Sequence, residues 1–178
     1  MHPTLVLIGF MGCGKSSIGR RLAYMTGHRF VDTDELVVQR EDCTISEIFA
    51  LGGEQAFREV EHSVLAELVG TIGIVLATGG GAILREANRN LLHEIGIVVW
   101  LDAHPDVLFE RATRGNRRPL LQTANPRESF DTLLSSRRSI YEATADFRIE
   151  SSYLDHDEVA RTVLEKATAL HATRLAAP

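Results

Sequence analysis

Short, unbroken apolar runs alternate along the chain with longer segments in which apolar residues recur every three to four positions. The first pattern is typical of strands buried on both faces, and the second of helices with one apolar side. Strands are predicted at residues 4–8, 74–77 and 97–101, with weaker ones at 29–31 and 147–149. One helix is predicted to begin after the glycines that precede Lys15 and to end at Gly27. Three more are predicted over 44–52, 54–69 and 105–114. Further helices are predicted to begin at about Glu86, to run through Leu133, and to extend from Val159 to Leu170. The last six residues, from Thr173, are expected to fray.

This order of elements predicts the architecture. Strands that are apolar throughout and alternate with helices form parallel sheets covered by helices on both faces. A chain of 178 residues has the length of one domain, and no repeat, low-complexity tract or linker divides it. We therefore expect a single α/β domain over residues 1–178 with five strands. Ligands of such folds bind beyond the carboxyl ends of the strands, so the candidate chemistry is sought there.

Composition excludes several classes of protein. Apolar residues make up 44% of the chain, but no apolar run approaches the ~20 residues that span a bilayer, so no membrane segment is expected. The formal net charge of −5 argues against a general nucleic-acid partner. Two cysteines cannot form a disulfide framework, and a reducing, cytoplasmic location is expected.

Basic charge is concentrated in one segment. Residues 111–127 contain five arginines and no acidic residue, so this segment carries +5 while the remainder of the chain carries −10. The segment is either a solvated basic loop or a local binding site for anions. Lys15 and Lys166 are the only lysines among the 19 basic residues, so a lysine within a functional motif is expected to have a specific chemical role.

The exit of the first strand carries the strongest motif. Residues 9–16 read GFMGCGKS and match the phosphate-binding pattern G-x-x-x-x-G-K-S in full. The glycines let backbone N–H groups curl around phosphate oxygens, and the following helix N-terminus adds its dipole. Lys15 is expected on the β- and γ-phosphates, and the Ser16 hydroxyl on magnesium. A glycine-rich turn without a ligand is the alternative, but motif, strand and helix agree, so a nucleoside triphosphate is expected to bind.

The second strand exit reads Asp32-Thr33-Asp34. Because strand residues alternate sides, acids two apart would point the same way, towards the phosphates. One acid could hold the metal while the other accepts or orients the proton of a hydroxyl group; a surface turn is the alternative. The chain has no N-K-x-D motif, which GTPases use to recognise guanine, and its length fits a small kinase better than a motor ATPase.

A series of motifs resembles the shikimate kinase family. The series comprises residues 12–17, Asp32-Thr33-Asp34, FREVE at 57–61, the glycines 79–81, RPLL at 118–121 and the segment from Arg137 to Tyr141. Order and spacing are kept from residue 4 to about residue 150. The resemblance implies a P-loop, nucleoside-monophosphate-kinase-like three-layer fold, with strand order 2-3-1-4-5, a substrate-binding region at about 33–61 and a lid at about 112–125. It also implies ATP-dependent phosphorylation of the 3-hydroxyl of shikimate. The protein is expected to be a monomer.

The resemblance further implies roles for individual residues. Lys15, Asp34 and Arg118 would be catalytic, with Asp34 as base and Arg118 closing over the phosphates. The residues implied to bind ATP are Gly12, Cys13, Gly14, Lys15, Ser16, Ser17, Arg111 and Arg118, with Arg111 stacked on adenine. Those implied to bind shikimate are Asp34, Arg58, Gly80 and Arg137, and those implied to hold Mg²⁺ are Ser16 and Asp32.

The residue types fit the substrate roles. Arginine forks bind a carboxylate through two parallel charge-assisted bonds. Arg58 and Glu61 are three apart, so they would share a helix face on which Glu61 holds the guanidinium; a surface ion pair is the alternative. The four-residue spacing to Tyr141 favours Arg137 over its neighbour Arg138.

Two other functions stay open at this point. A gluconate-type kinase is one, because the two arginines suit other carboxylates; a non-catalytic nucleotide-binding module is the other, although Lys15, Asp34 and Arg118 argue against it. Residues 150–153 depart from the family, since they lack the arginine that some members present to adenine. Cys13 is either a small buried filler or a thiol activated by Lys15 and the helix N-terminus.

Overall fold

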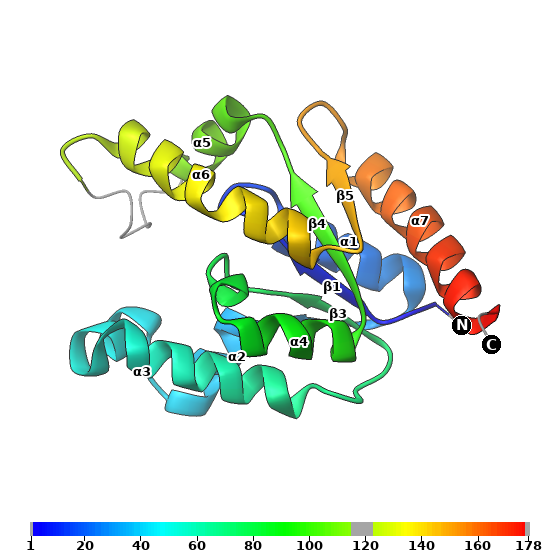
Figure 1. Cartoon of the computed structure of the whole chain (residues 1–178), viewed down its shortest axis with the longest axis horizontal. Helices are drawn as coiled ribbons and strands as arrows, with labels where there is room; N and C mark the ends of the chain where they lie inside the picture. Colours follow the sequence, from blue (N-terminus) through cyan, green and yellow to red (C-terminus); the bar gives the residue numbers. More distant parts are fainter. Residues whose placement is uncertain (1, 115–122, 177–178) are drawn as a thin grey trace.

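Five parallel strands form one sheet in the order β2-β3-β1-β4-β5 (Figure 1). The structure is a computed structural model and describes residues 2–114 and 123–176. The strands are β1 (Leu5–Ile8), β2 (Arg29–Asp32), β3 (Ile74–Ala77), β4 (Ile97–Asp102) and β5 (Phe147–Glu150). Every pair of neighbours is parallel, so the expected sheet and its order 2-3-1-4-5 are confirmed.

The burial of the strands explains their apolar sequences. All residues of β1, β3 and β4 are buried, because these strands lie inside the sheet with helices on both faces. The edge strands β2 and β5 are each buried at only one position, Val31 and Ile149. Their weaker sequence signal follows from this partial burial.

Helices cover both faces of the sheet (Figure 1). The helices α1 (Lys15–Thr26) and α7 (His156–Ala176) pack together on one face, while α4 (Glu86–Ile95) and α6 (Pro126–Thr144) cover the other. The remaining elements are α2 (Thr33–Glu41), α3 (Ile45–Glu67), the short 3₁₀ helix η1 (Ala82–Leu84) and α5 (Pro105–Thr113). No helix of the described residues is long and apolar enough to cross a membrane.

Three local predictions need correction or refinement. Helix α2 was not expected, because Asp32 to Asp34 were interpreted as a continuation of the strand; the strand ends at Asp32, which caps the helix by accepting a hydrogen bond from the Asp34 backbone N–H. The two helices predicted at 44–52 and 54–69 form α3, which is interrupted at Gly53 by non-helical backbone (φ 71°, ψ −174°). The fraying expected from Thr173 is wrong for the described residues, because α7 continues to Ala176.

The chain brings three loops to one edge of the sheet. The carboxyl ends of β1, β2 and β3 lie side by side, with Asp32 level with Ala77 and Leu7 level with Ala77. Beyond these ends, the Gly79 backbone N–H donates to Thr33 Oγ1 over 2.9 Å, and the Thr78 backbone N–H donates to the Leu7 carbonyl over 3.1 Å. The loops that carry the three strongest motifs are therefore neighbours.

Candidate active site

The loop between β1 and α1 has the backbone shape of a phosphate-binding loop. Gly14 caps α1 in the left-handed region (φ 89°), so the chain turns sharply into the helix. Gly12 is also left-handed (φ 84°), and a Cβ atom there would overlap the carbonyl oxygen of Leu108. The first N–H groups of α1, at Lys15, Ser16 and Ser17, have no partners within the helix and can donate to an anion.

Lys15 folds back over this loop. Its ammonium donates to the carbonyls of Gly9 (2.8 Å) and Phe10 (3.2 Å) and lies 3.5 Å from the sulfur of Cys13. Cys13 is fully buried, and its backbone N–H donates to the Phe10 carbonyl. Phosphate oxygens would replace these weaker neutral acceptors, since charge-assisted hydrogen bonds are the stronger kind.

Ser16 and Asp32 form the pair suited to a magnesium ion. The Ser16 hydroxyl donates to Asp32 Oδ2 over 3.0 Å, so oxygens from the exits of β1 and β2 lie together. Among the described residues, no three His, Cys, Asp or Glu side chains gather into a metal cluster. Magnesium prefers oxygen ligands and is usually held by one or two protein groups together with phosphates and water, so this pair fits the ion.

The triple-glycine turn after β3 gathers the expected substrate residues. A Cβ atom on Gly79 would lie 2.8 Å from Asp34 Oδ1 and 3.0 Å from Glu61 Oε1, so both carboxylates pack directly against the backbone. A Cβ on Gly81 would lie 2.8 Å from Cζ of Arg58. Side chains from α2 and α3 thus meet on a backbone without side chains of its own.

The same turn touches the phosphate loop and α6. A Cβ on Gly80 would lie 3.6 Å from the Gly9 carbonyl oxygen, which is ordinary van der Waals contact. The Gly80 carbonyl accepts hydrogen bonds from Arg137 Nη1 (3.3 Å) and from the Tyr141 hydroxyl (2.6 Å). Asp34, Arg58, Gly80 and Arg137 therefore lie around one turn beside the phosphate loop.

Two acids hold the guanidinium of Arg58. Nη1 donates to Glu61 Oε2 over 2.8 Å, and Nη2 donates to Glu54 Oε1 over 3.1 Å, so the expected Arg58–Glu61 pair is confirmed. Burial lowers the pKa of Arg58, but the contacts with Glu61 and Glu54 outweigh burial and raise it. Arg58 is consequently a permanent cation in a fixed place.

Glu61 is the most deeply buried acid of the site. Its side chain is 1% exposed, and its Oε1 atom has no hydrogen-bond partner among the residues that the structure describes. Burial raises the pKa of Glu61 although the Arg58 cation opposes this, and the nearby charges of Asp34 and Glu54 raise it further. An anion that binds to Arg58 would therefore lie close to the carboxyl groups of Glu61, Asp34 and Glu54, and the positive charge of Arg58 would have to offset their repulsion.

Arg111 and the start of α6 belong to the regions expected to bind the nucleotide and to form the lid. Arg111 Nη2 donates to the Ser151 carbonyl over 3.4 Å, which joins α5 to the segment after β5. Arg118 and residues 115–122 of the expected lid lie outside the described residues. Arg127, at the start of α6, pairs with Asp106 in the first turn of α5 (2.7 Å) and with Asp131 of α6 (2.8 Å).

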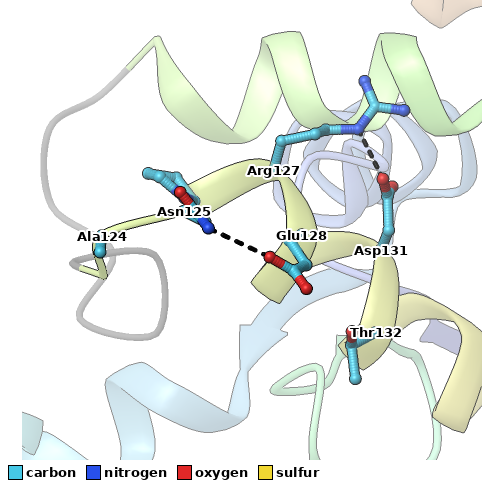
Figure 2. A pocket seen from close by; sticks show the side chains of 7 residues that line it. Ala124, Asn125, Arg127, Glu128, Asp131 and Thr132 are labelled. Carbon is cyan, nitrogen blue, oxygen red and sulfur yellow. Dashed lines mark hydrogen bonds and ion pairs between the residues drawn. The ribbon is translucent and has the colours of Figure 1, made fainter.

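A shallow hollow lies at the start of α6, as Figure 2 shows. In this view Arg127 points towards Asp131, and Asn125 towards Glu128. Most of the side chains that line the hollow are exposed, four of them form two pairs, and none of the expected substrate residues lines it. The hollow therefore lies at the end of the segment expected to form the lid (112–125) and is not the place where the expected substrate residues meet.

Comparison with known proteins bears directly on this arrangement. The family model described as shikimate kinase matches residues 11–168. The shikimate kinase of Actinobacillus pleuropneumoniae serotype 5b is 44% identical over 161 residues, which cover 90% of this chain and 93% of that protein. This chain belongs to the shikimate kinase family.

Solved structures agree with this membership. The shikimate kinase of Acinetobacter baumannii, solved in complex with shikimate, has a TM-score of 0.89 and 37% sequence identity, and the match covers 95% of this chain and 94% of that one. A gluconokinase from Sinorhizobium meliloti matches with a TM-score of 0.63 at 19% identity over 97% of this chain and 95% of that one, which shows a shared fold alone.

Membership of the shikimate kinase family leaves the roles of single residues as predictions. Sequence reasoning singled out the residues that surround the triple-glycine turn, apart from the buried hydroxyl of Tyr141, to which it gave no role. It also did not foresee that Gly79 and Gly81 serve as surfaces on which the charged groups pack. The only sequence signal for either feature is the presence of these residues in motifs shared with the family.

Proposed function

We propose that this protein transfers the γ-phosphoryl group of ATP to the 3-hydroxyl of shikimate, giving shikimate 3-phosphate and ADP. The observation that carries the proposal is the meeting of Asp34, Arg58 and Arg137 around the triple-glycine turn, in contact with the phosphate loop. Two arginines and one carboxylate suit a substrate with one acid group and neighbouring hydroxyl groups. The region 33–61 supplies Asp34 and Arg58, and it serves as the substrate-binding region.

The arginines orient the substrate. Arg58 and Arg137 bind its carboxylate, and the backbone of Gly80 adds a contact that a side chain at this position would obstruct. Bidentate guanidinium–carboxylate bonds restrict rotation as well as position, so the 3-hydroxyl is presented to Asp34 in one orientation. A lysine could hold the charge but not the orientation.

Asp34 prepares the acceptor. It accepts the proton of the 3-hydroxyl as the hydroxyl oxygen forms its bond to the γ-phosphorus and the bond from that phosphorus to the β–γ bridging oxygen breaks. Negative charge then grows on the departing ADP. Lys15, the N–H groups of the phosphate loop and Arg118 of the lid (residues 112–125) balance this charge. Closure of the lid also excludes water, which would compete with the sugar-like hydroxyl.

Further residues hold the nucleotide. Backbone groups of the phosphate loop and first helical turn bind its phosphates, and Arg111 stacks on adenine. Ser16 and Asp32 would hold Mg²⁺, which would neutralise part of the charge on the phosphates of ATP. The residues proposed to bind ATP are Gly12, Cys13, Gly14, Lys15, Ser16, Ser17, Arg111 and Arg118.

One assay tests the proposal. ADP release from Mg-ATP is measured with shikimate, with gluconate and with neither, and release that requires shikimate is expected. Release with gluconate in place of shikimate would support a gluconate-type kinase, and nucleotide binding without turnover would support a non-catalytic module. We further propose that the protein is cytoplasmic and monomeric. Light scattering of the purified protein tests the monomeric state, and a constant dimer mass would contradict it.

A further inference from the structure

Tyr141 is a buried residue of the candidate site that has no role in the chemistry above. Its side chain is 1% exposed, and its ring stacks on Trp100 of β4 with ring centres 5.9 Å apart and planes 16° from parallel. Its hydroxyl donates to the Gly80 carbonyl over 2.6 Å. Burial raises the pKa of Tyr141, so the hydroxyl keeps its proton and remains a donor.

The Gly80 carbonyl is held differently from its neighbours. The carbonyls of Gly79 and Gly81 accept from the backbone N–H groups of Ala82 and Leu84, over 3.1 and 3.0 Å. The Gly80 carbonyl instead accepts from two side chains of α6, Tyr141 at 2.6 Å and Arg137 at 3.3 Å. Because these two residues are four apart, they lie on the same side of the helix and reach the same acceptor.

The direction of this carbonyl affects both arginines. A trans peptide is planar, and the described chain contains no cis bond, so the orientation of the Gly80 carbonyl sets that of the Gly81 N–H and the path of the backbone to Gly81. The guanidinium of Arg58 packs on Gly81, and Arg137 shares the carbonyl itself. One buried hydroxyl is thus linked to both groups that face the substrate carboxylate.

We propose that Tyr141 is a positioning residue whose hydroxyl holds the Gly79–Gly81 turn so that Arg58 and Arg137 converge on the carboxylate of the substrate. The inference rests on the proposed function. The hydroxyl makes the shorter bond to the Gly80 carbonyl and so leaves the remaining donors of Arg137 for the substrate. Without it, Arg137 becomes the main donor to that carbonyl, and the turn loses one of its two anchors on α6.

The variant Tyr141→Phe removes only the hydroxyl. The shikimate KM is expected to rise about 3- to 10-fold, the effect of one neutral hydrogen bond, while kcat and the ATP KM stay within about twofold. The matched control is Thr144→Val, which removes another buried hydroxyl one turn along α6; that hydroxyl donates to the Ile140 carbonyl over 2.7 Å. This control is expected to leave both KM values and kcat within about twofold.

Rescue separates positioning from packing. 3-Fluorotyrosine at position 141 keeps the hydroxyl and is expected to restore the wild-type shikimate KM. An unchanged shikimate KM in folded Tyr141→Phe would overturn the inference, as would an equal rise for both substrates. If Tyr141→Phe does not fold, the fluorine resonance of the 3-fluorotyrosine protein must shift when shikimate saturates the site; an unmoved resonance overturns the inference.

Assays of the wild-type protein distinguish a failure of the proposed function from a failure of the role of Tyr141. Absence of shikimate-dependent ADP release in the wild type refutes the proposed function and this inference with it. When the wild type is active, a failed Tyr141→Phe prediction refutes the role of Tyr141 alone.

Discussion

The guanidinium of Arg58 lies against the α-carbon of Gly81, at a position that leaves no room for a methyl group between them. A Cβ on Gly81 would lie 2.8 Å from both Cζ and Nη1 of Arg58, well inside van der Waals contact. The backbone of Gly81 is not left-handed, so an alanine there is limited by this contact and not by its own backbone. The position of the Arg58 guanidinium therefore favours glycine at position 81.

We predict that Gly81→Ala weakens shikimate binding without unfolding the protein. The methyl group displaces the end of a flexible side chain, so the guanidinium moves and loses a charge-assisted bond to the substrate. Such a bond contributes about 1.5–3 kcal/mol, so the shikimate KM should rise roughly 10- to 150-fold. The ATP KM should stay within about twofold, as steady-state kinetics with each substrate varied in turn will show.

A double variant shows whether Gly81 acts through Arg58. Arg58→Lys alone is also expected to raise the shikimate KM, since lysine lacks the planar fork. Because both changes disturb the same contact, adding Gly81→Ala to Arg58→Lys should cause little further loss. Fully additive effects would show that Gly81→Ala acts by another route.

We predict that Asp34→Asn keeps ATP binding but loses turnover. The change removes the proton acceptor and leaves the phosphate loop intact, so kcat should fall about 10²- to 10⁴-fold. Titration calorimetry with Mg-ATP and an ADP-release assay measure the two properties. Glu35→Gln is the matched control, because Glu35 is the next residue and pairs with Arg20 at the surface. Turnover of Asp34→Asn within about threefold of wild type would rule out the role as base.

The buried carboxyl of Glu61 predicts a dependence of stability on pH. Since its pKa in the folded protein is raised, the folded state holds this proton more tightly than the unfolded state does. The contribution of Glu61 is therefore most favourable below about pH 4.3, the ordinary pKa of glutamate, and is lost as pH rises from there to the raised pKa. Above the raised pKa the loss is complete and constant.

Glu61→Gln should remove this dependence. In urea titrations over a pH series, the unfolding free energy of wild type is expected to fall relative to that of Glu61→Gln through this interval. The limiting slope for one proton is about 1.4 kcal/mol per pH unit. Both proteins share all other titrating groups, so their difference isolates Glu61, and parallel curves would contradict a raised pKa.

The parts of the fold that sequence reasoning predicted are those with local signals. The runs at β1, β3 and β4 are apolar because both faces are buried, and the GFMGCGKS loop needs its residue types for its backbone shape. Helix α2 was missed although it had a signal: Asp32 is a favoured N-cap, and acids at 34 and 35 suit a first helical turn. The pattern Asp-x-Asp was interpreted by strand alternation instead.

Contacts between distant residues were the part that sequence could not supply. Glu61 follows Arg58 by three residues, so their pairing on one helix face was predictable. Tyr141 and Gly80 are 61 residues apart, and nothing in either segment specifies that one hydroxyl meets one carbonyl. That contact exists because α6 crosses the sheet face beside the turn after β3, which only the packed structure determines.

The two cysteines provide a last test, since the structure favours one of the two interpretations of Cys13. Its side chain is fully buried in the phosphate loop, 3.5 Å from Lys15 Nζ, whereas Cys43 is partly exposed. Desolvation and the neighbouring acids Glu47, Glu41 and Asp42 raise the pKa of Cys43, which slows but does not block its reaction. We predict that iodoacetamide labels Cys43 first. Cys13 should react more slowly, and more slowly still with Mg-ATP, because its labelling requires the loop to open.

Mass spectrometry of both cysteine-containing peptides over time measures these labelling rates, and the variant Cys43→Ser isolates the reaction of Cys13. Faster labelling of Cys13 than of Cys43 would restore the activated-thiol interpretation.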